Sequence, residues 1–483
     1  MNVLPLPLFW LECAILVALV GALCISRIRD PLHAWRWGLL FTGATFGCSL
    51  LACLGFYLCR FTQVADQGSW QPYLFGRRLF GLDELSAPLI PLVALLHFLT
   101  ALATGRTKMR RFSLSWSLSA EALRLATFAS QEAGLLIGLL AAGTVPAYVE
   151  LLNRGQPTRL YLLHMGLFVS LMLLGWVGLS SGTGSQTQIA SATVALLAAM
   201  LIRCGTVPVH CWLTDWFEHA SLGNALLFVT PLTGVYAMLR LVLPIAPDWV
   251  PQSIGVFSLM TAFYAAGMAV VQKDARRFFA FLFLSHASLV LVGMELHTVI
   301  SLTGALALWV AGTLSLTGLG LTLRALEARF GRLSLAHFHG LYDHSPALAV
   351  CFLMTGLASV GFPGTLGFVA TELLVEGAVQ ANPLVGLVVA LVATINGIAI
   401  VRVYFRLFTG ACHASTVALG ITPRERFAVL TLAVLILGGG LLPQPGIFSR
   451  YQAAMTILRE RENRATTASY PTTQDGIMQR RMR

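Results

Sequence analysis

Long apolar runs follow one another along almost the whole chain, and short stretches with charged residues, proline or glycine separate them. Stretches of about 18 to 25 apolar residues recur along the chain, and this is the length that an α-helix needs to cross about 30 Å of hydrocarbon. The pattern therefore predicts an all-α membrane protein with about 14 transmembrane helices. The predicted spans are residues 6–25, 36–58, 85–104, 112–130, 133–152, 159–180, 187–213, 222–244, 253–272, 276–294, 298–323, 345–373, 383–409 and 427–447.

Basic residues indicate which loops face the cytoplasm. Lys and Arg gather in every second loop, as Arg110, Lys273 and Arg424 illustrate, and are scarce in the loops between. Because short cytoplasmic loops are rich in Lys and Arg, this bias predicts that the N-terminus lies outside. We expect the protein in the cytoplasmic (inner) membrane of a prokaryote. The basic C-terminal segment then also lies outside, so either the number of spans differs by one or this segment docks on a partner.

Composition agrees with a membrane domain, because 57% of the 483 residues are hydrophobic and 11% are charged, against roughly 25% charged in soluble proteins. The net charge of +11 raises the question of nucleic acid. However, the basic residues lie in loops and the tail without a basic face interleaved with aromatics, so we expect no nucleic-acid partner. The cysteines form no paired CxxC clusters, and no P-loop or dinucleotide fingerprint occurs. We therefore expect neither a metal site nor a bound cofactor.

Two predicted spans contain residues that interrupt a helix. The seventh, AMLIRCGTVPVHCWLTDWFEHAS, contains Pro208, and the twelfth, LASVGFPGTLGFVATELL, contains Pro363 and Gly364. Proline removes a helical hydrogen bond and clashes with the preceding turn, so each span should be a broken helix whose freed backbone groups line a polar interior. Broken helices five spans apart are typical of transporters built from two repeats. The sequence thus predicts two inverted five-helix repeats, each with a broken helix.

This organisation divides the chain into five parts. The N-terminal helices 1–3 occupy residues 1–111, the first repeat (helices 4–8) 112–245, the second repeat (helices 9–13) 246–410, the last helix 411–449, and a basic, flexible C-terminal tail 450–483.

Ionisable residues inside a bilayer are costly and therefore indicate function. Arg203 and His210 lie seven residues apart on the seventh span, a spacing that returns to the same face of a regular helix. Either the charge of Arg203 tunes a protonatable imidazole, or Arg203 binds loosened backbone carbonyls and His210 caps the break. The other candidates for a proton or ion pathway are Glu132, Glu150, His286 and Glu372.

Further charged residues lie where spans meet the membrane boundary, and these are candidates either for an ion site or for a solvated collar of ion pairs. They are Asp215, Glu218, Lys273 and Asp274.

An ordered set of segments resembles one family. The segments are FGLDELSAPL (80–89), RCGTVPVHCWLTDWFEHAS (203–221), PLTGVYAMLRLVLP (231–244), VVQKDARRFFAFLFLSHASLVLVG (270–293) and GLYDHSPALAVCFLMTGLASVGFPGTLGFVATELL (340–374). In order and spacing they are similar to the antiporter-like, proton-conducting membrane subunits of respiratory complex I, Mrp-type antiporters and membrane-bound hydrogenases. The resemblance extends from about residue 80 to residue 410.

The resemblance implies a conduction path with a Glu on the fifth helix, a Lys on the seventh, a Lys or His on the eighth, and a Lys or Glu in the second broken helix. In this chain the first three positions hold Ala141, Arg203 and Leu232, and the eleventh span carries no charge. Arginine stays protonated, so Arg203 can bias a neighbouring group but cannot pass protons on. Half of the implied relay is therefore absent.

The resemblance implies a membrane subunit of an ion-translocating complex, in which conduction of protons, or of a cation such as sodium, is coupled to a partner's reaction. Its partners would be the bilayer and other membrane and soluble subunits. As an enzyme it would be at most a non-redox subunit of an NADH:quinone oxidoreductase-like translocase. Alternatively, the basic tail and depleted relay suit a membrane anchor of a two-component inorganic-carbon (CO2/bicarbonate) uptake system with a soluble zinc partner. A third reading is an independent secondary transporter, although nothing specifies an organic substrate.

Overall fold

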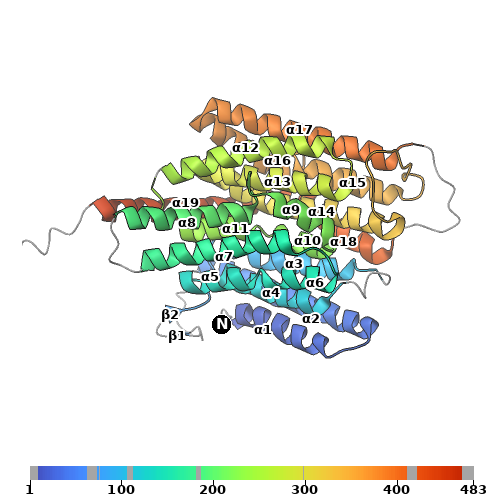
Figure 1. The fold of residues 1–483 in the computed structure, drawn as a ribbon, viewed down its shortest axis with the longest axis horizontal. Coiled ribbons are helices and arrows are strands. Elements are labelled where there is room, and N and C mark those ends of the chain that lie inside the picture. Colours follow the sequence, from blue (N-terminus) through green and yellow to red (C-terminus); the bar gives the residue numbers. More distant parts are fainter. Residues whose placement is uncertain are drawn as a thin grey trace, which may run out of the picture.

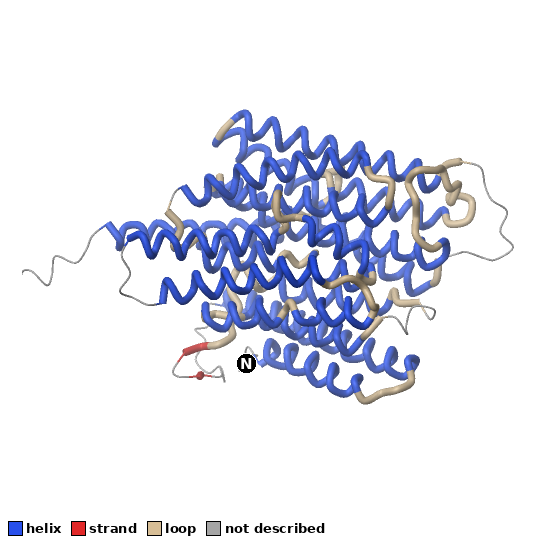
Figure 2. Tube along the Cα trace, viewed as in Figure 1, coloured by secondary structure: helices blue, strands red, loops and turns tan. Residues whose placement is uncertain are grey.

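The computed structural model describes residues 9–62, 73–74, 77–105, 112–180, 186–247, 249–296, 298–410 and 421–469. Within these ranges most of the chain is helical, and the helices run side by side along the long axis of the molecule (Figures 1 and 2). Two strands of two residues each, β1 (Tyr73–Leu74) and β2 (Arg77–Arg78), pair antiparallel.

The N-terminal helices are α1 (Phe9–Ser26), α2 (Pro31–Thr62) and α3 (Leu89–Leu102). Helices α1 and α2 pack on each other and form the lower edge of the bundle in Figure 1. Trp35 joins α2 to the end of α3, because its indole N–H donates to the carbonyl oxygen of Ala101 at 3.0 Å. This contact satisfies the polar end of a buried aromatic ring.

The next helices surround the candidate site described below. They are α4 (Leu114–Ala129), α5 (Ala133–Ala142), α6 (Val145–Asn153), α7 (Arg159–Ser180), α8 (Gln186–Cys204), α9 (Cys211–His219), α10 (Leu222–Val229), α11 (Thr233–Ala237) and the π-helix η2 (Met238–Val242).

The C-terminal half consists of longer helices. They are α12 (Trp249–Val271), α13 (Ala275–Glu295), α14 (Val299–Phe330), α15 (Pro346–Ser359), α16 (Leu366–Ala381), α17 (Pro383–Phe408), α18 (Pro423–Leu441) and α19 (Gln444–Ser469). Helices α13 and α14 are almost entirely buried, whereas α7 and α17 expose large apolar side chains. An apolar exterior of this kind is suited to contact with lipid.

Nine helical segments of the described ranges are long and apolar enough to cross a membrane, and the bent pair α18–α19 brings the number to ten. The apolar helices α3 and α15, and the apolar part Gln188–Cys204 of α8, are shorter than this length. The chain is therefore an all-helical protein with many membrane-spanning segments. The count of about 14 spans and the inversion of the two repeats stay predictions.

The residues that predicted the two helix breaks lie between helices in the structure. Pro208 lies between α8 and α9, and Gly205 before it has a left-handed backbone with φ of +74°. Pro363 and Gly364 lie between α15 and α16, and Gly364 has φ of +84°. A side chain rarely adopts such angles, which explains why glycine occupies these positions.

A further break, which the sequence did not predict, divides the predicted eighth span. Helix α10 ends at Val229 and α11 begins at Thr233. Leu232 between them has a left-handed backbone with φ of +51°, an unusual conformation for a residue with a branched side chain. The proline at position 231 interrupts the helix here, just as Pro208 does in the seventh span.

The C-terminal segment differs from the flexible tail expected over 450–483, because α19 continues as a helix to Ser469. The axes of α18 and α19 meet at 78°, and α19 packs along α14. The buried guanidinium of Arg450 donates to the carbonyl oxygens of Glu84 at 2.5 Å and Leu85 at 3.2 Å. The basic segment therefore docks on its own chain. Residues 470–483 lie outside the described residues.

Candidate functional site

A group of polar side chains is buried between α3 and α4. His97 of α3 and Glu121 and Arg124 of α4 are 1%, 0% and 7% exposed. Glu121 and Arg124 lie three residues apart on one helix, so both side chains face the same neighbour. Polar groups without water are costly unless they are paired, which makes this cluster a candidate for function rather than packing.

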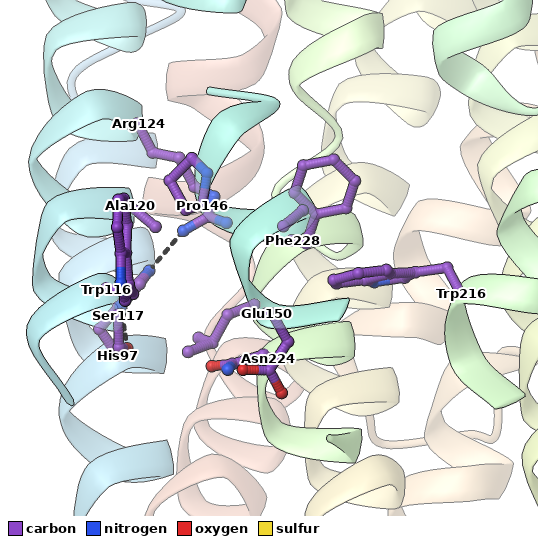
Figure 3. A pocket seen from close by; sticks show the side chains of 12 residues that line it. His97, Trp116, Ser117, Ala120, Arg124, Pro146, Glu150, Trp216, Asn224 and Phe228 are labelled. Atoms are coloured by element: carbon purple, nitrogen blue, oxygen red, sulfur yellow. Dashed lines mark hydrogen bonds between the residues drawn. The ribbon is translucent and has the colours of Figure 1, made fainter. Parts of the chain in front are cut away.

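The imidazole of His97 lies between three polar groups. Arg124 Nη1 donates to His97 Nε2 at 2.9 Å, as the dashed line in Figure 3 shows. Ser117 Oγ lies 3.4 Å from His97 Nδ1, and Glu121 Oε2 lies 3.8 Å from the same nitrogen. A guanidinium has no acceptor atom, so Nε2 must accept and a neutral ring carries its hydrogen on Nδ1. That hydrogen faces Ser117 and Glu121.

A small cavity separates this cluster from α6, α9 and α10. It is lined by His97 and Arg124 on one side and by Glu150, Trp216 and Asn224 on the other (Figure 3). Glu150 is buried, and its Oε1 accepts the backbone N–H of Ser221 at 3.2 Å and lies 3.8 Å from Arg154 Nη1. The side chain of Arg154 is 26% exposed, so Glu150 lies near the surface end of this cavity.

A second small cavity lies on the other side of Arg124. Arg203 of α8 and Thr233 of α11 line it together with Arg124. Ala120, Arg124 and Phe228 line both cavities, so the two adjoin. A row of polar groups thus runs from Glu150 through His97 and Arg124 to Arg203.

Arg203 and His210 contact different neighbours. Arg203 Nη2 donates to Thr233 Oγ1 at 2.9 Å, and its guanidinium carbon lies 4.3 Å from the ring centroid of Phe228. The ring centroid of His210 lies 5.4 Å from the ring centroid of Tyr264 of α12. The helix break between the two residues changes the direction of the chain, so they do not share one face as the spacing suggested.

The remaining candidates lie apart from the row. His286 is buried in α13, and neither of its ring nitrogens has a hydrogen-bond partner among the described residues. Glu132 is half-buried before α5, in a groove that Arg240 also lines. Glu372 is exposed on α16, so it does not point into the interior of this chain. The structure does not bring these three together.

The boundary residues form a belt of ion pairs. Glu218 Oε2 lies 2.8 Å from Arg277 Nη2, and Asp215 Oδ1 lies 3.1 Å from His219 Nδ1. Asp274 caps α13 by accepting the backbone N–H of residue 276, while Lys273 is exposed. These ion pairs favour a solvated collar over an ion site.

A buried ion pair lies just inside the belt. Arg276 of α13 and Glu327 of α14 form two hydrogen bonds, of 2.7 and 2.8 Å. Arg276 Nη1 also donates to the carbonyl oxygen of Ala220 at 2.9 Å. The pair therefore connects α13, α14 and the end of α9.

Sequence reasoning did not place His97, Glu121 and Arg124 on the pathway. The available signal was the Glu121–Arg124 spacing inside an otherwise apolar run. Both side chains face the interior of the bundle rather than lipid, which is the usual position of ionisable residues in a membrane helix. No group of three or more His, Cys, Asp or Glu side chains in the described ranges could hold a metal ion.

Several known proteins are similar to this chain in sequence. Residues 160–396 match the family described as "NADH:quinone oxidoreductase/Mrp antiporter, TM". NADH-quinone oxidoreductase subunit 13 of Thermus thermophilus is 30% identical over 329 residues, which cover 63% of this chain and 69% of that protein. The F420H2 dehydrogenase subunit M of Methanosarcina mazei is 26% identical over 470 residues, which cover 89% of this chain and 94% of that protein.

Solved structures share the fold. A chain of respiratory complex I from Thermus thermophilus aligns with a TM-score of 0.79 at 23% identity, over 93% of this chain and 99% of that one. A chain of an archaeal membrane-bound sulfane sulfur reductase aligns with a TM-score of 0.80 at 17% identity, over 94% and 99%. With the matched segments and the bundle of apolar helices, these similarities lead to one conclusion: the chain is an integral membrane protein that belongs to the family of antiporter-like membrane subunits of NADH:quinone oxidoreductases and Mrp antiporters.

Proposed function

We propose that this chain is a membrane subunit of an ion-translocating complex and that protons move between its N-terminal helices and its first repeat. The observation that carries the proposal is the contact of His97 with Arg124 between two adjoining cavities. A titratable imidazole buried beside space for water is suited to holding and releasing a proton. The complex around it is inferred from the relatives, which are named as subunits of dehydrogenases and quinone oxidoreductases.

In the proposed mechanism Arg124 controls access to His97. While the guanidinium donates to Nε2, that nitrogen cannot take up a proton. When the guanidinium moves towards the second cavity, Nε2 becomes free to accept a proton, and the hydrogen on Nδ1 can pass to Glu121. The neutral ring then carries its hydrogen on Nε2, so Arg124 can donate to this nitrogen again only after Nε2 has lost that hydrogen and Nδ1 has regained one. Arg203 stays charged and biases the position of Arg124 by repulsion, because two cations in a water-poor interior repel each other strongly.

Glu150 is the proposed proton entry of this row. It is buried at the end of the cavity that His97 lines, and it lies beside the partly exposed Arg154. Its carboxylate would serve in place of the fifth-helix acid that the family resemblance implies at position 141. Loss of the acid at Ala141 is thus compatible with a working path.

The second repeat takes a smaller part in this proposal. His286 is its proposed proton site, because it is buried in α13 and neither ring nitrogen is bonded to a described residue. His210, Glu132 and Glu372 stay candidates for the two ends of the route. The five-part division of the chain, the inverted repeats and an external N-terminus belong to the same proposal.

The inorganic-carbon alternative has less support. The relatives described above are named as dehydrogenase and quinone oxidoreductase subunits, and none of these names refers to carbon dioxide or bicarbonate. The tail, whose charge suggested an anchor for a soluble partner, docks on its own chain through Arg450.

The test is proton flux through the purified complex. The complex is isolated by a tag on this chain, its subunits are identified by mass spectrometry, and it is placed in liposomes with a pH-sensitive dye. A membrane potential then drives proton uptake. We expect His97→Gln to lower the rate by about tenfold or more, because glutamine accepts from Arg124 but does not titrate.

The matched control is His164→Gln, since His164 is also buried but lines neither cavity. Its uptake should equal that of the wild type. Undiminished uptake by both His97→Gln and Glu150→Gln would refute the proposed route, and isolation of the chain without other subunits would refute the complex.

A further inference from the structure

Arg124 and Arg203 face one cavity that offers them no carboxylate. The cavity lies between α4, α5, α8 and α11, and its other polar lining groups are the hydroxyls of Thr127 and Thr233. Leu140 and Phe228 contribute apolar walls. Both arginines are more than nine-tenths buried.

Neither guanidinium has a carboxylate within 4.0 Å in the described part of the chain. Arg124 bonds to His97, and Arg203 bonds to Thr233, so each uses one of its five N–H groups in these contacts. Glu121 does not line the cavity, and Glu150 lines the neighbouring one beside Arg154. Glu121, one turn away on α4, interacts with Arg124 but not with Arg203 and lies outside the cavity. Inside the cavity the two cations therefore have no negative partner, which is unfavourable.

We propose that this cavity binds a small monovalent inorganic anion of the size of chloride between Arg124 and Arg203. The space accommodates one or two water-sized species, which fits a monatomic anion and excludes organic anions. Thr233 accepts a hydrogen bond from Arg203, so its own hydroxyl hydrogen is available to the anion. Arg203 thereby gains a negative partner, which no carboxylate in the lining of the cavity provides.

The binding site does not depend on proton conduction. It rests on the charges and the shape of the cavity, and binding is measured on the purified protein without a membrane potential. A result against proton flux through His97 would leave it intact, and a result against the anion would leave the proposed function intact.

The first experiment is a titration of thermal stability. The full chain, in its complex, is held in gluconate at constant ionic strength while chloride or bromide replaces gluconate, and the unfolding midpoint is recorded for this chain by accessibility of its buried cysteines to a thiol dye. A ligand that binds the folded state raises the midpoint with its concentration. We expect a rise of about 2 °C or more at saturation, and an unchanged midpoint would overturn the proposal.

Three variants locate the site. Arg203→Gln should raise the half-saturating chloride concentration by about tenfold or more, because one of the two cations is lost. Thr233→Asp places a carboxylate on the partner of Arg203 and should abolish the chloride response while the protein stays folded. Arg324→Gln is the matched control, since Arg324 is equally buried but bonds to Thr100 and Thr104 outside this cavity. It should keep the full response.

The second experiment places the anion directly. Diffraction data from crystals grown in bromide should show an anomalous peak between Arg124 and Arg203, and this measurement needs no variant. A peak elsewhere only, or a chloride response that persists in Thr233→Asp, would overturn the proposal.

Discussion

Arg124 donates a hydrogen bond to His97 across the interface of α4 and α3, with 2.9 Å between Nη1 and Nε2. A permanently charged donor thereby occupies one nitrogen of a titratable ring. The other nitrogen faces the carboxylate of Glu121 at 3.8 Å. The direction of this one bond fixes which side of the ring can exchange a proton.

The first prediction concerns the hydrogen on that ring. With Arg124 donating to Nε2, the neutral His97 ring carries its hydrogen on Nδ1. Solid-state NMR of protein labelled with 15N-histidine should show this form in the difference between the wild type and His97→Gln. A neutral ring with its hydrogen on Nε2 would contradict the bond direction. In Arg124→Gln the side-chain amide can either donate or accept, so the preference for Nδ1 should weaken.

The second prediction concerns the buried Arg276–Glu327 pair. Arg276→Ala leaves the Glu327 carboxylate, which is 4% exposed, without its cation and removes a bond to the end of α9. The loss of stability should be about 3 to 5 kcal/mol. The neighbouring Arg277 is 53% exposed in its pair with Glu218, so Arg277→Ala should cost at most about 1 kcal/mol. Thermal unfolding in detergent compares the two, and equal losses would contradict the assignment.

The third prediction concerns the close packing of α14 on α16. A methyl group on Gly304 would lie 2.5 Å from the backbone nitrogen of Leu374, which cannot move aside as a flexible side chain could. Gly304→Ala should therefore destabilise by about 1 to 3 kcal/mol. Gly312 lies on the same buried helix with open space around it, so Gly312→Ala should be neutral or slightly stabilising. The fraction of protein that stays monodisperse after heating distinguishes the two, and a stable Gly304→Ala would contradict the packing.

The fourth prediction concerns the docking of α19. Arg450→Gln removes charge-assisted bonds to the carbonyl oxygens of Glu84 and Leu85, each worth about 1.5 to 3 kcal/mol. The helix should then detach more often, and trypsin should cleave it faster in limited digests. Arg459 is exposed on the same helix, so Arg459→Gln should change digestion only at its own site. Equal protection of α19 in both variants would show that Arg450 does not hold it.

The sequence predicted the helical fold because lipid leaves the backbone few choices. In lipid, a chain of apolar runs must satisfy its backbone N–H and C=O groups internally. Each run therefore forms a helix, whichever other helices pack beside it. Pro208 and Pro363 were equally informative, since a proline beyond the first turn of a helix interrupts or kinks it. The same logic applied to Pro231, where the break went unpredicted.

The candidate site was less predictable. Arg203 was identified from its position inside a span, and Glu150 from its charge at a span end. His97 and Arg124 are 27 residues apart and meet only because α3 and α4 pack together. Glu372 carries the right chemistry but is exposed, because the rotation of α16 is set by the fit of its glycines and leucines against α14.

The sequence alone thus determined that this protein is an integral membrane protein, that it is helical, and where the predicted seventh and twelfth spans break. All three conclusions follow from local hydropathy and backbone chemistry. The tertiary structure decided which charges share a cavity and which ion pairs form at the predicted membrane boundary. It also decided that the basic C-terminal helix binds its own chain. Those outcomes depend on the rotation and contact of helices, and helix rotation is a property of packing rather than of any single segment.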